Sequence, residues 1–164
     1  MIEAIENFLT NIVGPHLSVL ICSMIPIIEL RGAIPLGVGL GLNPWVAFLL
    51  AILGNMIPVP FILLLIKKFI AWCSKSNVKF LQKFGAFLLR KAEKNRSKVE
   101  RFGFWGVALF VAIPLPVTGA WTGSLVAAVI DLKFWKAMLS CLIGLIIAGL
   151  IVLAITVGIS TLFS

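Results

Sequence analysis

Two long apolar segments limit what this chain can fold into more than any other feature of the sequence. Trp45–Ile66 and Ala137–Gly158 contain no charged residue, and each exceeds the roughly 20 residues that a helix needs to cross a bilayer. Of all residues, 61% are apolar and only 12% are charged, and a soluble domain of this length could not bury so much apolar surface. The sequence therefore predicts an all-α, polytopic integral membrane protein with one membrane domain over residues 1–164, and it excludes a soluble enzyme.

Most of the positive charge lies in one segment. The net charge is +8, and eleven of the fourteen Lys and Arg residues fall between Lys67 and Arg101. Cytoplasmic loops of membrane proteins carry such an excess, and no motif that reads nucleic acid accompanies it. We expect a multi-pass protein of the cytoplasmic membrane whose basic segment 67–101 is cytoplasmic. Within it, residues 73–101 are expected to form a linker helix that contacts membrane lipids, although a soluble loop is the alternative.

The rest of the chain divides into two similar halves. Residues 1–14 are predicted to form an amphipathic helix, whose acidic start argues against a signal peptide. Apolar segments 15–42 and 102–131 are each interrupted by a proline-flanked break, and each is followed by a spanning helix, at 44–72 and 133–160.

An internal repeat relates the two halves. Gly41–Ala47 aligns with Asp131–Ala137, the same register puts Gly54 on Gly144, and near the breaks Gly32-Ala33 matches Gly119-Ala120 with a three-residue slip. Interrupted segments at corresponding positions of two halves are a sequence pointer to a transporter site.

The broken segments could either span the membrane or fold back as re-entrant hairpins. With the basic segment inside, the hairpin topology also keeps Lys133 and Lys136 inside and places the acidic N-terminus outside. Four spans would put these two lysines outside. We therefore expect two inverted repeats, each made of a re-entrant helical hairpin and a transmembrane helix, with the two breaks meeting near the midplane of the bilayer.

Glu29 and Arg31 are the only charged residues deep within an apolar segment. A charge at the bilayer centre costs about 2.5–3.5 kcal/mol on insertion scales, so these two need partners or a function. They could form an ion pair that fixes the hairpin turn. In the functional interpretation, which is compatible with such an ion pair, Arg31 binds an anionic substrate together with the backbone near Gly32, while Glu29 either orients the anion or carries a proton.

The second break offers polar groups without charge. We expect Pro35 to begin one half-helix and Thr118 to act as the N-cap of the other, followed by Gly119 and Thr122. The N-terminus of a half-helix favours an anion, although the two threonines could simply bond to their own helices. Asn55, in the middle of a span, either satisfies the backbone that Pro58 frees or faces the cavity.

The break motifs ELRGAIP (Glu29–Pro35) and IPLPVTGAWTG (Ile113–Gly123) resemble those of the small multidrug export protein family. That family is similar in turn to the DedA superfamily, whose members have two facing re-entrant hairpins and move lipids, including lipid phosphates, across bilayers. DedA members usually carry two arginines around the second break, and Ala112–Thr118 has none. The resemblance implies a DedA-like fold and a lipid or lipid-phosphate translocase.

We therefore expect a membrane transporter that translocates an amphiphilic anion, a lipid phosphate or a phospholipid, coupled to protons and working as a homodimer. The acyl chain of the substrate would stay in the lipid. One alternative is proton-driven efflux of small cationic amphiphiles with Glu29 as the shared proton and drug site, and another is a scaffold that transports nothing. The sequence indicates no catalytic group, metal site or cofactor, and its cysteines, Cys22, Cys73 and Cys141, lack metal-ligand spacing.

Overall fold

The structure of the chain is a computed structural model that describes residues 14–75, 83, 85–87, 90, 93, 102–114 and 118–162. The expected helix over residues 1–14, apart from Gly14, and nearly all of the linker 76–101 lie outside these residues. Every element within the described ranges is a helix, which confirms the all-α class. The helices are Gly14–Met24, α2 (Glu29–Gly39), α3 (Pro44–Met56), α4 (Pro58–Lys75), α6 (Gly103–Ala112), α7 (Ala120–Val129) and α8 (Phe134–Leu162).

Two helical stretches are long and apolar enough to cross a membrane. They are Pro44–Ile66, which comprises α3 and the first half of α4, and Phe134–Ile159 of α8. Only 28% and 33% of their most apolar windows are buried inside the molecule, so most of their apolar surface faces outward. An apolar exterior of this extent is typical of a protein surrounded by lipid.

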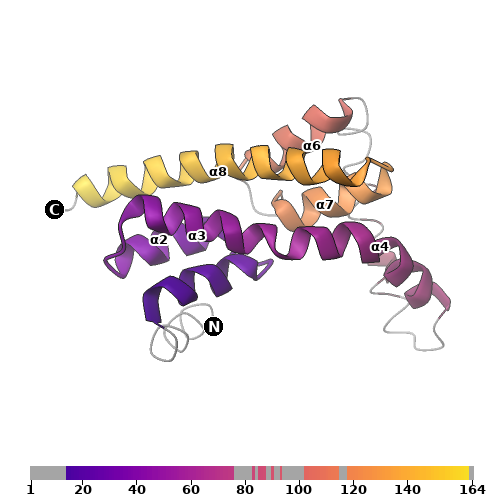
Figure 1. Ribbon diagram of the computed structural model, residues 1–164, viewed down its shortest axis with the longest axis horizontal. Coiled ribbons are helices and arrows are strands. Elements are labelled where there is room, and N and C mark those ends of the chain that lie inside the picture. Colours follow the sequence, from indigo (N-terminus) through magenta and orange to yellow (C-terminus); the bar gives the residue numbers. More distant parts are fainter. Residues whose placement is uncertain are drawn as a thin grey trace.

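The long helices run in opposite directions. α8 lies beside α3 and α4, and the chain passes along α3–α4 toward one end of the molecule and returns along α8 (Figure 1). Regular helical structure is interrupted at Ile57, between the end of α3 and the start of α4 at Pro58. A proline lacks the N–H that would continue the helical ladder.

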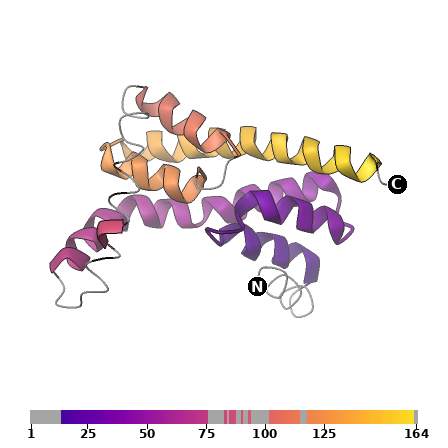
Figure 2. The same ribbon diagram turned by 180° about the vertical axis from the view of Figure 1, so that it is seen from behind.

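Each interrupted segment folds back on itself as a helical hairpin. Helix Gly14–Met24 and α2 form the first hairpin and pack at one end of the long helices, whereas α6 and α7 form the second at the other end (Figures 1 and 2). Both hairpins turn near the middle of the molecule. We call these turns tip 1 (residues 25–28) and tip 2 (residues 113–114 and 118–119, the described part of the second turn). Eight of the ten residues of α7 are buried, because α4, α6 and α8 surround it.

The start of α2 differs from the sequence-based expectation. We expected Pro35 to begin this half-helix, but α2 begins at Glu29 and Pro35 lies inside it. The break is therefore shorter than the sequence indicated, and a turn over residues 25–28 is enough to reverse the chain. A proline inside a helix removes one backbone hydrogen bond, a loss that surrounding protein can compensate in membrane helices.

The turns after the two hairpins have the same geometry. The N–H groups of Leu42 and Leu132 each donate to the carbonyl five residues earlier, at 3.0 Å, which is the bond that ends a helix in a Schellman motif. The residues before them, Gly41 and Asp131, both have positive φ angles, +80° and +57°. These positions lie 90 residues apart, in the register that the sequence alignment predicted.

Two glycines bring a hairpin arm directly against a long helix. A Cβ added at Gly54 would overlap the Leu20 carbonyl of the first hairpin, and one added at Gly144 would overlap the Ala108 carbonyl of α6. These glycines are also 90 residues apart. The same close contact between helix backbones therefore occurs once in each half of the chain.

Candidate functional site

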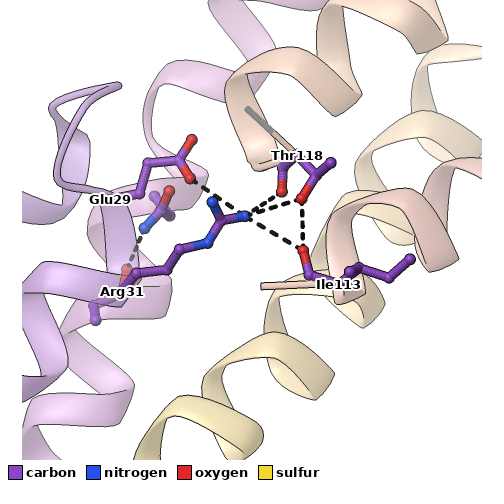
Figure 3. Close-up of polar contacts among 6 residues, drawn as sticks. Glu29, Arg31, Ile113 and Thr118 are labelled. Carbon is purple, nitrogen blue, oxygen red and sulfur yellow. Dashed lines mark hydrogen bonds and ion pairs between the residues drawn. The ribbon is translucent and has the colours of Figure 1, made fainter. Parts of the chain in front are cut away.

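Arg31 connects the start of α2, next to tip 1, with tip 2. It lies in the first turn of α2, and its Nη2 donates to the Thr118 carbonyl, to the Ile113 carbonyl at 3.4 Å and to the Thr118 hydroxyl at 3.3 Å (Figure 3). Ile113 is the C-cap of α6, where helix carbonyls lack intrahelical donors and carry partial negative charge. The guanidinium therefore stabilises the broken end of α6 in the opposite half of the chain.

Glu29 lies against the other side of the same break. Its carboxylate is 3.9 Å from Arg31 Nη2, and a Cβ added at Gly119, the N-cap of α7, would overlap both carboxylate oxygens. The start of a helix carries partial positive charge, so the carboxylate has a cation on one side and this helix end on the other. Glu29 is 7% exposed, and the expected ion pair with Arg31 is present.

The backbone of Glu29 is strained. Its φ angle is +51°, a left-handed conformation that costs a residue with a side chain roughly 1–2 kcal/mol. Conformations of this kind persist where surrounding contacts hold them and are concentrated at functional sites. Contacts with Arg31 and Gly119 hold Glu29 here.

A third contact crosses between the tips in the reverse direction. Trp121 of α7 donates from Nε1 to the carbonyl of Met24 at 3.0 Å, which is the last residue of helix Gly14–Met24. Trp121 lies 90 residues after Arg31. Each of these side chains therefore bonds a carbonyl at the end of the other hairpin's first arm.

The structure brings together four of the predicted site residues: Glu29, Arg31, Thr118 and Gly119. The expected role of Thr118 as an N-cap is wrong, because Gly119 is the N-cap residue of α7. Glycine has no side chain that could bond to the first N–H groups of the helix. The Thr118 hydroxyl instead donates to the Ile113 carbonyl at 2.6 Å. Gly119 has the extended backbone of an N-cap residue, so α7 begins one residue later than a cap at Thr118 would require.

The remaining predicted site residues lie around this group. Gly32 follows Arg31 in α2 and is half-buried, and Thr122 is buried within α7. Asn55 is fully buried and donates to the Ala51 carbonyl of its own helix at 3.3 Å, rather than to the Gly54 carbonyl that Pro58 leaves without its usual donor. Among the described residues, Asn55 Oδ1 is the one buried side-chain oxygen or nitrogen without a hydrogen-bond partner.

An open groove of about 330 Å³ lies beside Arg31. Pro35 and Pro114 border it near the tips, and one face of α8 forms the rest of its wall. The α8 residues are Val152, Ile155, Thr156 and Ile159. Sequence reasoning missed this face, because apolar residues at helical spacing on a spanning helix are indistinguishable from residues that face lipid. The charged Arg31 therefore borders an otherwise apolar surface.

The described ranges contain no group of three or more His, Cys, Asp or Glu side chains that could hold a metal ion. The polar groups that meet between the two hairpins include the Arg31 guanidinium, the Glu29 carboxylate, the Thr118 hydroxyl and backbone carbonyls at the break.

Comparison with known proteins identifies the family. A family model described as "Putative small multi-drug export protein" matches residues 29–151, a range that begins at Glu29, directly after tip 1, and includes Arg31 and tip 2. No curated protein and no solved structure matches the chain, and the similarity to DedA proteins stays a prediction from the tip motifs. The matched range covers most of the sequence, and the chain therefore belongs to the small multi-drug export protein family.

Proposed function

We propose that this protein exports amphiphilic molecules across the cytoplasmic membrane and that its substrate carries an anionic head group, such as the phosphate of a lipid. The observation that carries the proposal is the position of Arg31. Its side chain is 21% exposed and borders an apolar groove where the two tips meet. A cation at the edge of an apolar surface complements an anionic head group on an apolar molecule.

The re-entrant topology is part of the proposal, and helix lengths support it. The hairpin arms Gly14–Met24, α2, α6 and α7 have ten or eleven residues each, so each is about 15–16 Å long. The hydrocarbon core is about 30 Å thick, and an arm of this length reaches only its middle. The tips would then meet near the midplane, with their irregular backbone buried in protein.

The inverted repeat is supported by roles that recur 90 residues apart. Gly41 and Asp131 end equivalent helices, Gly54 and Gly144 allow equivalent close contacts, and Arg31 and Trp121 bond to opposite hairpins. The 90-residue register therefore extends from the turns back along α2 and α7 to Arg31 and Trp121. With the basic segment 67–101 cytoplasmic, the first hairpin would enter from outside and the second from the cytoplasm.

Glu29 is the proposed proton carrier. Its carboxylate lies against Arg31 and Gly119, the groups that an anionic head group would also approach. Protonation would remove its charge and weaken both contacts, so that a substrate anion could replace it. In this way one proton taken up by Glu29 would accompany one anion bound at Arg31.

Export of cationic amphiphiles is the second candidate, and the family description favours it. Glu29 would then bind the drug cation or the proton in turn. Its enclosed position counts against this function, because Glu29 does not border the groove and its carboxylate contacts the second tip.

Transport in proteoliposomes tests the proposal. We expect Arg31→Gln to reduce translocation of a fluorescent lipid phosphate at least tenfold, because the head group loses its counter-charge. Lys133→Gln is the matched control, since it also removes one positive charge but at an exposed position after α7. Circular dichroism and size-exclusion chromatography check folding.

The same assay separates the two candidates. Export of a cationic dye should depend on Glu29 and survive Arg31→Gln if the cation function is correct. Unchanged lipid-phosphate transport in folded Arg31→Gln, or transport of the dye alone, would contradict the proposed anion specificity.

A further inference from the structure

We propose that the groove beside Arg31 binds the hydrocarbon chain of a single-chain anionic amphiphile, so that the protein holds both the head group and the tail. This inference rests on the proposed function, because it takes Arg31 as the head-group site. It differs from the expectation that the acyl chain stays in the lipid, and it assigns a binding role to α8 that sequence reasoning did not.

The groove wall is one continuous helical face. Its four α8 residues follow the spacing i, i+3, i+4 and i+7 from Val152, which places them on the same side of the helix. Ile155 and Ile159 are more than half exposed, so the face is accessible from outside the molecule. An extended chain could therefore lie along α8 with one end at Arg31.

The lining residues give the groove one end that suits a charged head group and another that suits a hydrocarbon tail. Arg31 is the charged residue among those that border the groove. Thr156 is polar, but its hydroxyl donates to the Val152 carbonyl at 2.8 Å, so its hydrogen is used within the helix. The wall beyond Arg31 thus suits a hydrocarbon chain. A second polar group on the ligand would find no hydrogen-bond donor in this wall.

The volume indicates one chain. About 330 Å³ is at the lower end of the roughly 300–1,000 Å³ typical of small-molecule sites. Lipid tails are as apolar as the groove, so the hydrophobic effect gives a membrane-embedded site little advantage over the bilayer. We therefore expect the groove to select by shape, favouring chains that fill it.

Binding of alkyl phosphates to the protein in phosphatidylcholine nanodiscs tests this inference, with empty nanodiscs as the correction for partitioning. Ile155→Trp adds a large side chain to the groove wall, where it would occupy space that the ligand chain needs. We expect this substitution to weaken binding of dodecyl phosphate about tenfold and to change binding of butyl phosphate less than twofold. Ile146→Trp is the matched control, because Ile146 is exposed on another face of α8 and does not border the groove.

A second variant tests the same idea by enlarging the groove. We expect Ile155→Ala to shift the preference from dodecyl phosphate toward hexadecyl phosphate, since removal of the side chain leaves room for a longer chain. This variant removes atoms from an exposed position, so it does not overpack the helix bundle.

The outcomes distinguish the groove from the head-group site. If Ile155 variants bind every chain length as the native protein does, while Arg31→Gln loses binding of both phosphates, the groove inference is wrong and the head-group site stands. If Arg31→Gln binds dodecyl phosphate normally, or dodecyltrimethylammonium binds equally well, the proposed function fails and the groove inference with it. Chain-length dependence that requires both Arg31 and Ile155 supports both.

Discussion

At the scale of single residues, Glu29 and Arg31 act mainly on the opposite half of the molecule. Arg31 bonds the carbonyl end of α6, and the Glu29 carboxylate lies at the start of α7. Helix ends leave backbone groups without intrahelical partners, and unsatisfied groups are costly where water is excluded. The two charges therefore stabilise a break in the second hairpin that has no charged residue among its described positions, 113–114 and 118–119.

Gly119 is the residue that permits this contact. We expect Gly119→Ala to lower the free energy of unfolding by about 1–3 kcal/mol, because its Cβ would overlap the Glu29 carboxylate. Thermal unfolding of the detergent-solubilised protein measures the effect. Gly39→Ala is the control, since a Cβ there meets nothing within 4 Å.

Combining Gly119→Ala with Glu29→Ala identifies the cause of this loss. Removal of the carboxylate should make the alanine at position 119 less costly than it is in the native protein, a non-additive result that indicates direct contact. Equal midpoints for native protein and Gly119→Ala would contradict the observed contact.

At the scale of elements, a glycine lets an arm of each hairpin approach a long helix closely. Gly54 allows helix Gly14–Met24 to contact α3, and Gly144 allows α6 to contact α8. Small residues let helix backbones approach in membranes, where packing and hydrogen bonds replace the hydrophobic effect as the driving force. These close backbone contacts therefore help to hold the short hairpin arms against the long helices.

Substitution of either glycine should separate an arm from its helix. We expect Gly54→Ala and Gly144→Ala each to lower the free energy of unfolding by about 1–3 kcal/mol, because backbone carbonyls cannot move aside as a flexible side chain can. Gly158→Ala in α8 should have little effect, since its Cβ would meet nothing within 4 Å. Thermal unfolding in one detergent compares all three, and a destabilisation by Gly158→Ala as large as the other two would indicate a general cost of replacing glycine.

At the scale of the whole molecule, the two halves of the chain run in opposite directions. α3–α4 and α8 are antiparallel, and the hairpins approach the centre from opposite ends (Figure 1). Transporters with inverted repeats bind substrate where discontinuous helices meet near the midplane, which is the place that Glu29 and Arg31 occupy in the proposed topology.

Cysteine labelling from each side of the membrane tests this topology. We expect Lys133→Cys and Lys83→Cys to react with a membrane-impermeant thiol reagent from the cytoplasmic side and Asn43→Cys from outside, in a protein whose three native cysteines are replaced. All three positions are exposed. Labelling of Lys133→Cys from outside would show that the interrupted segments cross the membrane fully.

The sequence by itself determined the helical class of protein, the two candidate spanning helices, the approximate places where the apolar segments break and the 90-residue spacing of the two turns. These features depend on local properties: hydropathy decides which segments suit lipid, and glycine and proline decide where a helix ends. The alignment of Gly41 with Asp131 and of Gly54 with Gly144 was reliable for the same reason, because each turn or close approach restricts the residue that can occupy it.

Only the tertiary structure decided what the charged residues contact. Glu29 and Arg31 meet partners more than 80 residues away, and neither hydropathy nor spacing encodes such a pairing. The start of α2 before Pro35, the cap of α7 at Gly119 and the groove on α8 were missed because hydropathy and residue spacing do not encode the backbone geometry or the packing on which they depend. Local sequence set the elements, and long-range packing between the halves assembled the site.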